Sequence, residues 1–367
     1  MKLPHPITIF VFLLLTAPAV AQMSLVPPAS TPAKPAGKPP ATANKPPPAA
    51  AKKAVRPAPP SLSPPPTANV VPAPEMNNPN VDVVFGAYQR GQYKTAFDLA
   101  TTRAKTGDLK AMTMLGELYS SALGAPHDYN KAAEWYKRAS DAGDREAMFA
   151  LAMMRIAGRG GPVDKGEAVK LLASATKLGE PKAAYNLALL YLDGQTLPQD
   201  VTRAAELLRQ AADAGLPQAQ YALATFYKVG TGVAQDLNKA VRLLQAASLA
   251  GNVDAEVEYA IALFNGKFKG KDEDKNNYIL IPQDKPAAVA LLRKAARQNS
   301  AIAQSRLAWL LFYGDGTPVD KIEGFKWHLI ARTAGKGEPE LDRLYSELSP
   351  ADQAKAEAAA KDWLGTK

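Results

Sequence analysis

The chain has 367 residues, with 44 lysines and arginines against 35 aspartates and glutamates, and it contains no cysteine. The lack of cysteine excludes disulfide bonds, a thiol nucleophile and a lipid anchor attached to cysteine. Residues 1–75 hold seven of the basic residues and a single acid, so the remainder carries only +3 of the net charge of +9. The basic character therefore belongs largely to the N-terminal segment, and the rest of the chain shows no motif that predicts nucleic-acid binding.

The first 21 residues are organised as a secretory signal peptide. Lys2 and the α-amino group form a positive start, residues 7–20 are an apolar run, and Ala19-Val20-Ala21 has the small-x-small pattern of a cleavage site. The run is shorter than the ~20 residues that a membrane-spanning helix needs, although an uncleaved anchor stays open as the alternative. We expect cleavage after Ala21 and a periplasmic protein, or alternatively a secreted one, with no transmembrane segment in the mature chain.

Residues 22–80 are rich in proline, alanine and lysine, with seventeen prolines between Val26 and Pro74. Such a composition buries too little apolar surface to offset its ordering entropy, and proline favours the extended polyproline II conformation. We expect a disordered linker. It is either a passive spacer or a basic segment that contacts anionic peptidoglycan.

Residues 81–107 predict a first pair of short helices. The turn between them falls in the stretch Ala87-Tyr88-Gln89-Arg90-Gly91-Gln92-Tyr93. This pair precedes the regular part of the chain, and we expect it to cap that part at its N-terminal end.

Six aspartates then mark a repeat: Asp128, Asp164, Asp200, Asp236, Asp284 and Asp320. The gaps between them are 36, 36, 36, 48 and 36 residues, and a period of this length indicates an array of supersecondary units. Each aspartate is followed by a small residue at +4, a large apolar residue at +7 and alanine at +11, which all lie on one face of an α-helix. Aspartate is a good N-cap, and the glycine or asparagine at +15 fits a left-handed helix stop. We therefore predict that a helix, called B, starts at each aspartate.

A second helix, called A, is predicted before each aspartate. It begins with an alanine column, carries a large apolar residue four positions on and a small residue next to that, and ends at a glycine in five of the six repeats. The alanines are Ala111, Ala147, Ala183, Ala219, Ala255 and Ala303, and repeat 1 departs from the pattern with Ala122 at the glycine position. Small residues in fixed places let two helices approach closely. Each unit is thus a helix–loop–helix pair that buries its apolar face only by stacking on its neighbours.

These columns resemble the Sel1-like repeat family, which is related to tetratricopeptide repeats. The resemblance rests on Ala183-x-x-x-Leu187-Ala188-x-x-Tyr191-x-x-Gly194 followed by Asp200-x-x-x-Ala204-x-x-Leu207-x-x-x-Ala211-x-x-x-Gly215, and it covers residues 108–340. It implies an all-α fold, a right-handed α-solenoid of six repeats. Residues 81–107 then resemble a degenerate tetratricopeptide unit, and residues 341–367 a C-terminal capping helix and tail.

The analogy with tetratricopeptide repeats implies that residues two and six positions after the first alanine of helix A face the concave side. An apolar ladder at these positions forms the candidate partner-binding groove: Phe149, Met153, Tyr185, Leu189, Tyr221, Val257, Ile261 and Trp309. Aromatic residues in a groove often anchor a partner peptide or helix. The alternative is that some of them, above all the two tyrosines, pack against the next repeat.

Repeat 5 carries twelve additional residues at 267–278, with the sequence KFKGKDEDKNNY, between its helices A and B. Insertions in repeat arrays map to loops that often contribute to binding. We expect a polar loop that either contacts a partner through Lys267, Lys269, Lys271 and Lys275 or is a solvated decoration.

No constellation for catalysis, cofactors or metal ions is recognisable. The chain has three histidines, none at metal-ligand spacing from another, and its Gly-x-Gly loops lack the Gly-Lys-Ser/Thr ending of a phosphate loop. The expected function is non-catalytic protein–protein interaction in the periplasm. The resemblance implies regulators that bind a membrane sensor as one such role; a peptidoglycan-associated organiser and, remotely, a β-lactam hydrolase are the alternatives.

Overall fold

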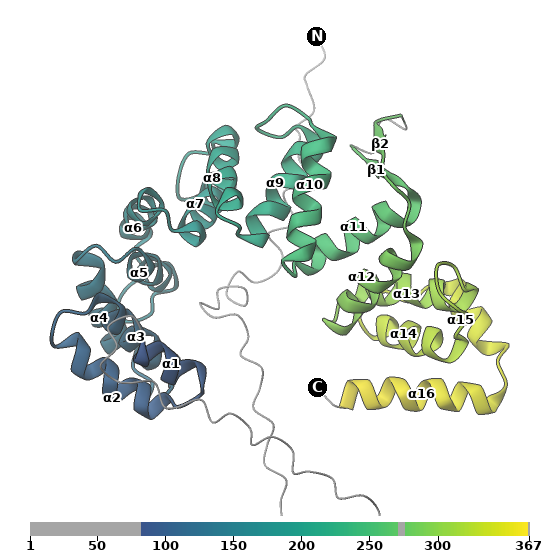
Figure 1. Ribbon diagram of the computed structural model, residues 1–367, viewed down its shortest axis with the longest axis horizontal. Coiled ribbons are helices and arrows are strands. Elements are labelled where there is room, and N and C mark those ends of the chain that lie inside the picture. The colour runs from purple at the N-terminus through teal and green to yellow at the C-terminus, as the bar shows by residue number, and fades with distance from the viewer. Residues whose placement is uncertain (1–81, 271–275, 366–367) are drawn as a thin grey trace, which may run out of the picture.

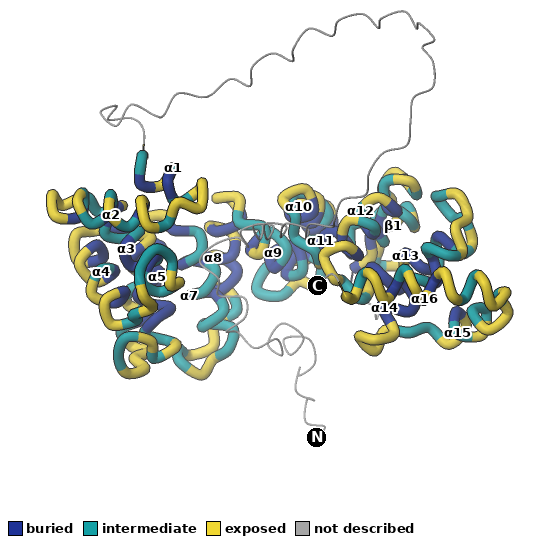
Figure 2. The backbone as a smooth tube through the Cα atoms, turned by 90° about the horizontal axis from the view of Figure 1, so that it is seen from below, coloured by how far each residue is buried: buried dark blue, intermediate teal, exposed yellow. Residues whose placement is uncertain are grey.

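The computed structural model describes residues 82–270 and 276–365, and in this part of the chain the helices stack side by side into an arc (Figure 1). The fold is the expected all-α solenoid, and the described residues also include a short β-hairpin. Buried residues run along the whole length of the array and do not gather at one centre (Figure 2). A solenoid of this kind is stabilised by contacts within each repeat and between neighbouring repeats.

The six repeats each supply one helix A and one helix B. The A helices are α3 (Leu109–Ser120), α5 (Arg145–Ala157), α7 (Pro181–Asp193), α9 (Pro217–Val229), α11 (Val253–Asn265) and α13 (Ala301–Tyr313). The B helices are α4 (Tyr129–Asp141), α6 (Lys165–Lys177), α8 (Val201–Asp213), α10 (Leu237–Leu249), α12 (Lys285–Arg297) and α14 (Lys321–Thr333). In Figure 1, α3 and α5 lie on the inner side of the arc and α4 and α6 on the outer side. The helices α1 (Val83–Gln89) and α2 (Tyr93–Ala104) form the first pair.

All six repeat aspartates are N-caps, as the sequence predicts. Each carboxylate accepts a hydrogen bond from the backbone N–H three residues on, at 2.7 to 3.0 Å. The backbone N–H of the same aspartate donates to a carbonyl near the end of the preceding helix A; Asp200, for example, donates to Tyr191 at 3.1 Å. One residue therefore starts helix B and ties it to helix A.

The glycines at the ends of both helices have the left-handed conformation that the sequence predicts. Gly194 ends α7 with φ 70°, and Asn299 takes the same conformation after α12 with φ 68°. Ala122, which replaces the usual glycine in repeat 1, also adopts a positive φ of 55°. In the loop after α9, a Cβ on Gly232 would lie 2.5 Å from the Val201 carbonyl oxygen of the preceding repeat. This loop glycine is thus needed for close contact between repeats.

The alanine columns are buried, and the core consists of several apolar clusters along the array. Ala132, Ala168 and Ala204 have no exposed surface. Gly116 shows why small residues are required, because a Cβ there would lie 2.6 Å from the Tyr136 ring. The small residues in these columns therefore allow each helix A to pack closely against its helix B.

The C-terminal cap differs from the single helix expected after residue 341. It consists of α15 (Pro339–Ser346) and α16 (Pro350–Gly365), because a proline at position 350 favours a new helix start and disfavours continuation of the first. Trp363 of α16 packs against Trp327 of α14, with ring centroids 5.1 Å apart. Within the described residues, no helix has the length and apolar character to cross a membrane.

We expect Asp200→Ala to lower the free energy of unfolding by about 1 kcal/mol, because the substitution leaves an N–H at the start of α8 without its cap. Asp200→Asn should retain most of the stability, since asparagine is an equally good N-cap. Urea unfolding followed by circular dichroism measures the difference. Asp213→Ala, at the exposed end of the same helix, is the control; an equal loss there would contradict the capping role.

Asp342 should make stability depend on pH in the acid range. The side chain of buried His328 bonds to this carboxylate at 2.8 Å and lowers the pKa of Asp342, and Arg332 lowers it further. A carboxyl whose pKa is lowered by folding stabilises the protein above its unfolded pKa, and this stabilisation is lost as the pH falls through the folded value. Thermal unfolding between pH 7 and pH 2 should therefore be less steeply pH-dependent in Asp342→Asn, while exposed Glu134→Gln should follow the natural profile.

Candidate functional site

Three residues of the predicted groove are buried in the core. Phe149, Met153 and Val257 are each 7% exposed and pack within the apolar clusters between neighbouring repeats. Their positions in helix A are those that the analogy assigns to the concave side, but their side chains are buried within the apolar clusters. The expectation that they offer a contact surface is corrected accordingly: for these three residues the packing alternative holds.

The other five groove residues keep part of their surface open: Tyr185, Leu189, Tyr221, Ile261 and Trp309. Both tyrosines also pack against the core, and burial raises the pKa of Tyr185. Burial, followed by the negative charges of Glu258 and Asp254, raises the pKa of Tyr221. The two carboxylates of α11 therefore lie close to Tyr221 of α9, on the same side of the array.

The inner surface contains a second set of residues that are not among the predicted groove residues. Asp254 and Glu258 precede Ile261 on α11 by seven and three positions, and Tyr313 follows Trp309 on α13 by four. Such spacings place residues on one face of a helix. The signal was thus present in the sequence: continuing the helical period from the two groove positions leads to these side chains.

The insertion in repeat 5 forms a β-hairpin and not the expected polar loop. Strand β1 (Lys267–Lys269) pairs antiparallel with β2 (Tyr278–Leu280), and Phe268 is opposite Ile279. Phe268 is only 3% exposed and joins the core cluster of the central repeats, while Lys267 and Lys269 on either side of it point to solvent. The apolar side chain therefore fixes the hairpin to the array. Lys271 and Lys275 lie outside the described residues.

The hairpin and the groove meet in one recess of about 520 Å³, called the basic recess here. Its lining comes from three elements: Lys228 of α9, Glu258, Ile261, Ala262 and Asn265 of α11, and Lys267, Phe268 and Lys269 of β1. The structure thus brings together Ile261 and two of the predicted lysines, which the sequence assigned to separate candidate sites. Lys228 was not anticipated, because nothing in the sequence links α9 to the insertion.

Charge and apolar surface are combined in the basic recess. Lys228 donates a hydrogen bond to Glu258 at 2.8 Å, and its Nζ lies 5.9 Å from the centre of the Phe268 ring. This pairing neutralises one lysine, so the charges of Lys267 and Lys269 give the rim a positive excess. Ile261 and Phe268 supply an apolar floor. Sites with an apolar lining and a few polar groups are typical of ligand recognition.

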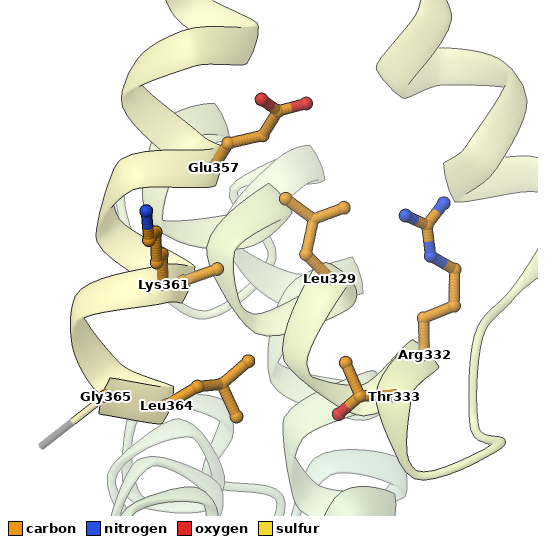
Figure 3. A pocket seen from close by; sticks show the side chains of 8 residues that line it. Leu329, Arg332, Thr333, Glu357, Lys361, Leu364 and Gly365 are labelled. Atoms are coloured by element: carbon orange, nitrogen blue, oxygen red, sulfur yellow. The ribbon is translucent and has the colours of Figure 1, made fainter.

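A second recess, of about 510 Å³, lies between α14 and α16. Leu329 and Leu364 point into it from the two helices, and Glu357, Lys361 and Arg332 lie around it (Figure 3). Arg332 also bonds to Asp342 of α15 at 3.2 Å. These groups serve the packing of the C-terminal cap, and they include no nucleophile next to a base.

The described residues contain no group of three histidines, cysteines or carboxylates that could hold a metal ion. His328 is completely buried and bonds to Asp342, so its position explains the contact between α14 and α15. His127 is exposed and lies edge-on against Tyr129. The repeat carboxylates are occupied as helix caps.

The family described as Sel1 repeat matches six segments, residues 109–144, 145–180, 181–216, 217–252, 279–300 and 301–336. The fifth match is short because the insertion separates α11 from α12. No curated protein matches the chain.

Two solved structures are similar to this chain. A Sel1 repeat protein from Oxalobacter formigenes is 25% identical, with a TM-score of 0.59 over 68% of this chain and 98% of that one. A protective antigen of uropathogenic Escherichia coli with an SLR fold is 22% identical, with a TM-score of 0.49 over 74% of this chain and 64% of that one.

We expect Phe268→Ala to release the β-hairpin from the array while the helices stay folded. Removing a buried phenylalanine typically costs about 3–5 kcal/mol, and here this cost should appear as local opening. Limited proteolysis should then cleave between residues 267 and 280 at least about tenfold faster. The control is Leu280→Ala on β2, where the side chain is 73% exposed. Equal cleavage of both variants would contradict the anchoring role of Phe268.

Proposed function

The chain belongs to the Sel1 repeat family, and we propose that it is a non-catalytic periplasmic scaffold that holds a protein partner at the surface beside its β-hairpin. Proteins built from Sel1 repeats typically mediate protein–protein interaction and are generally not catalysts. The observation that carries the proposal is the basic recess, where the insertion in repeat 5 adds charged side chains to a surface that the array already forms. A binding function needs no more than this preformed surface.

The chemistry of the recess defines the kind of partner segment it fits. Lys267 and Lys269 favour a carboxylate, and Ile261 with Phe268 favours an apolar side chain next to it. A partner segment with an acidic residue beside a large apolar one combines both contacts. The exported part of a membrane receptor is the partner class that we propose for this segment. The rigid repeats on either side reduce the entropy cost of binding, because they hold the lining residues in place.

Charge reversal at the hairpin tests the recess. A photoreactive residue in place of Asn265, at the recess, should crosslink the partner in cells, and mass spectrometry then identifies it. In the double variant Lys267→Glu and Lys269→Glu, the dissociation constant for that partner should rise about tenfold or more, because attraction is replaced by repulsion. The measurement is titration calorimetry with the purified pair.

The matched control is Lys177→Glu, an exposed lysine at the end of α6 and far from the hairpin along the array. An unchanged affinity in the hairpin variant, or an equal loss in the control, would contradict recognition at the recess.

The proposed location has its own test. The N-terminus of the purified protein should be Gln22, and the protein should leave the cell with the periplasmic fraction after osmotic shock. Recovery of the chain with Met1 in the cytoplasmic fraction would contradict export. This result would leave the binding surface itself unaffected.

A further inference from the structure

The last A helix displays an uncovered aromatic face, called the α13 face here and formed by Ile302, Arg306, Trp309 and Tyr313. Ile302 is 50% exposed, Tyr313 is 55% exposed and Trp309 is partly exposed. The rings of Trp309 and Tyr313 lie nearly parallel, at 9°, with their centroids 5.3 Å apart. Grouped apolar residues on a surface mark a place where another segment binds. A flat pair of rings suits a rigid apolar ligand such as the pyrrolidine ring of proline.

Carboxylates lie on both sides of the α13 face. On the neighbouring A helix, Asp254 and Glu258 occupy the repeat positions that Ile302 and Arg306 occupy on α13, 48 residues later. On the other side, Glu338 accepts a hydrogen bond from Ser305 of α13 at 3.1 Å. Burial, followed by the nearby charge of Glu258, raises the pKa of Asp254, so these two carboxylates lie close together on α11. A basic group that approaches the aromatic pair therefore meets carboxylates on both sides of the α13 face, while Arg306 is the basic residue of the face itself.

The chain itself contains a segment with the complementary chemistry. A basic residue precedes proline four times before the first helix, at Lys34-Pro35, Lys38-Pro39, Lys45-Pro46 and Arg56-Pro57. These residues lie outside the described part of the chain. Proline-rich sequences favour polyproline II, and aromatic grooves recognise such segments at a low entropy cost because the ligand is already extended. The combination of proline and lysine matches a surface that combines aromatic rings and carboxylates.

The connection between the two is long enough. The 25 residues from 57 to 81 reach about 80 Å when extended at ~3.1 Å per residue, and the upstream motifs reach further. In Figure 1, α1 lies on the inner side of one limb of the arc, and α13 belongs to the other limb. A tether of this length also holds its segment at an effective concentration near the millimolar range. A contact that is weak between separate molecules is then well populated within one chain.

We propose that residues 34–57 bind in cis to the α13 face, with prolines against Trp309 and Tyr313 and basic side chains toward Asp254 and Glu338. The segment then covers part of the inner surface whenever no partner is present. This role goes beyond the proposed scaffold function, and it does not depend on which partner the basic recess accepts.

Intramolecular photo-crosslinking tests the proposal with the full mature chain and without any partner. A photoreactive phenylalanine replaces Arg306, which is exposed on the α13 face, or Leu249, which is 79% exposed on α10 and is the control. Mass spectrometry then counts crosslinked peptides that derive from residues 34–57. We expect at least a tenfold higher yield from position 306 than from position 249. Equal yields, or no peptides from this segment, would overturn the proposal.

Two variants separate the contributions of the segment and the face. The triple variant Lys34→Glu, Lys38→Glu and Lys45→Glu should lower the yield from position 306 at least fivefold, and it changes no residue of the helical array. Trp309→Ala should lower it similarly, with Leu249→Ala as the control and circular dichroism to confirm that the array is folded. If Trp309→Ala unfolds, the triple variant decides. An unchanged yield in the triple variant contradicts the proposal.

A mixture of isotope-labelled and unlabelled chains distinguishes binding in cis from binding to a second copy. For binding in cis, each crosslinked peptide pair carries a single label state, and the product migrates as a monomer. Mixed label states would assign the α13 face to the segment of another molecule and would overturn the proposal as stated.

Discussion

A single aspartate fixes the relation between the two helices of every repeat. Its carboxylate caps helix B, while its backbone N–H donates to a carbonyl near the end of helix A, so two hydrogen bonds from one residue define both the start and the placement of the second helix. Unpaired N–H groups at a helix start are costly when they are partly buried. The six copies of this junction therefore set the path of the backbone, and the alanine columns set how closely the helices pack around it.

The repetitive part of the fold could be predicted from the sequence because its determinants are local. Caps, left-handed stops and the 4-, 7- and 11-residue spacings depend on a few neighbouring residues, and they recur six times. The helix break at Pro350 is local in the same sense, because proline favours the first turn of a new helix. The burial of a side chain, in contrast, cannot be predicted from local spacing. Phe149 and Met153 occupy groove positions but are buried, because burial depends on how the adjacent repeats pack.

The candidate site could be predicted only in part, because it depends on contacts between distant segments. Ile261 and Lys267 were both selected, but for separate surfaces. These two residues come together only because β1 pairs with β2 and Phe268 is buried. A three-residue strand is too short to show a periodic pattern, so neither feature can be predicted from the sequence. The single phenylalanine in this largely polar insertion is the one residue that indicates an apolar contact with the array. Lys228 joins the site from the preceding repeat, so only the stacking of repeats reveals it.

The junction also explains where this family member can change. Asp284 still donates to Leu263 at 3.0 Å, although twelve more residues separate the two than in the other repeats. The hydrogen bond closes the loop at its base, and the closure cost of a loop grows only slowly with its length. The exposed residues of this segment can thus change while the hydrogen bond at its base and the buried Phe268 keep it attached to the array. A change in the exposed residues of the insertion therefore leaves the helices on either side in place, so the recognition surface is separable from the fold.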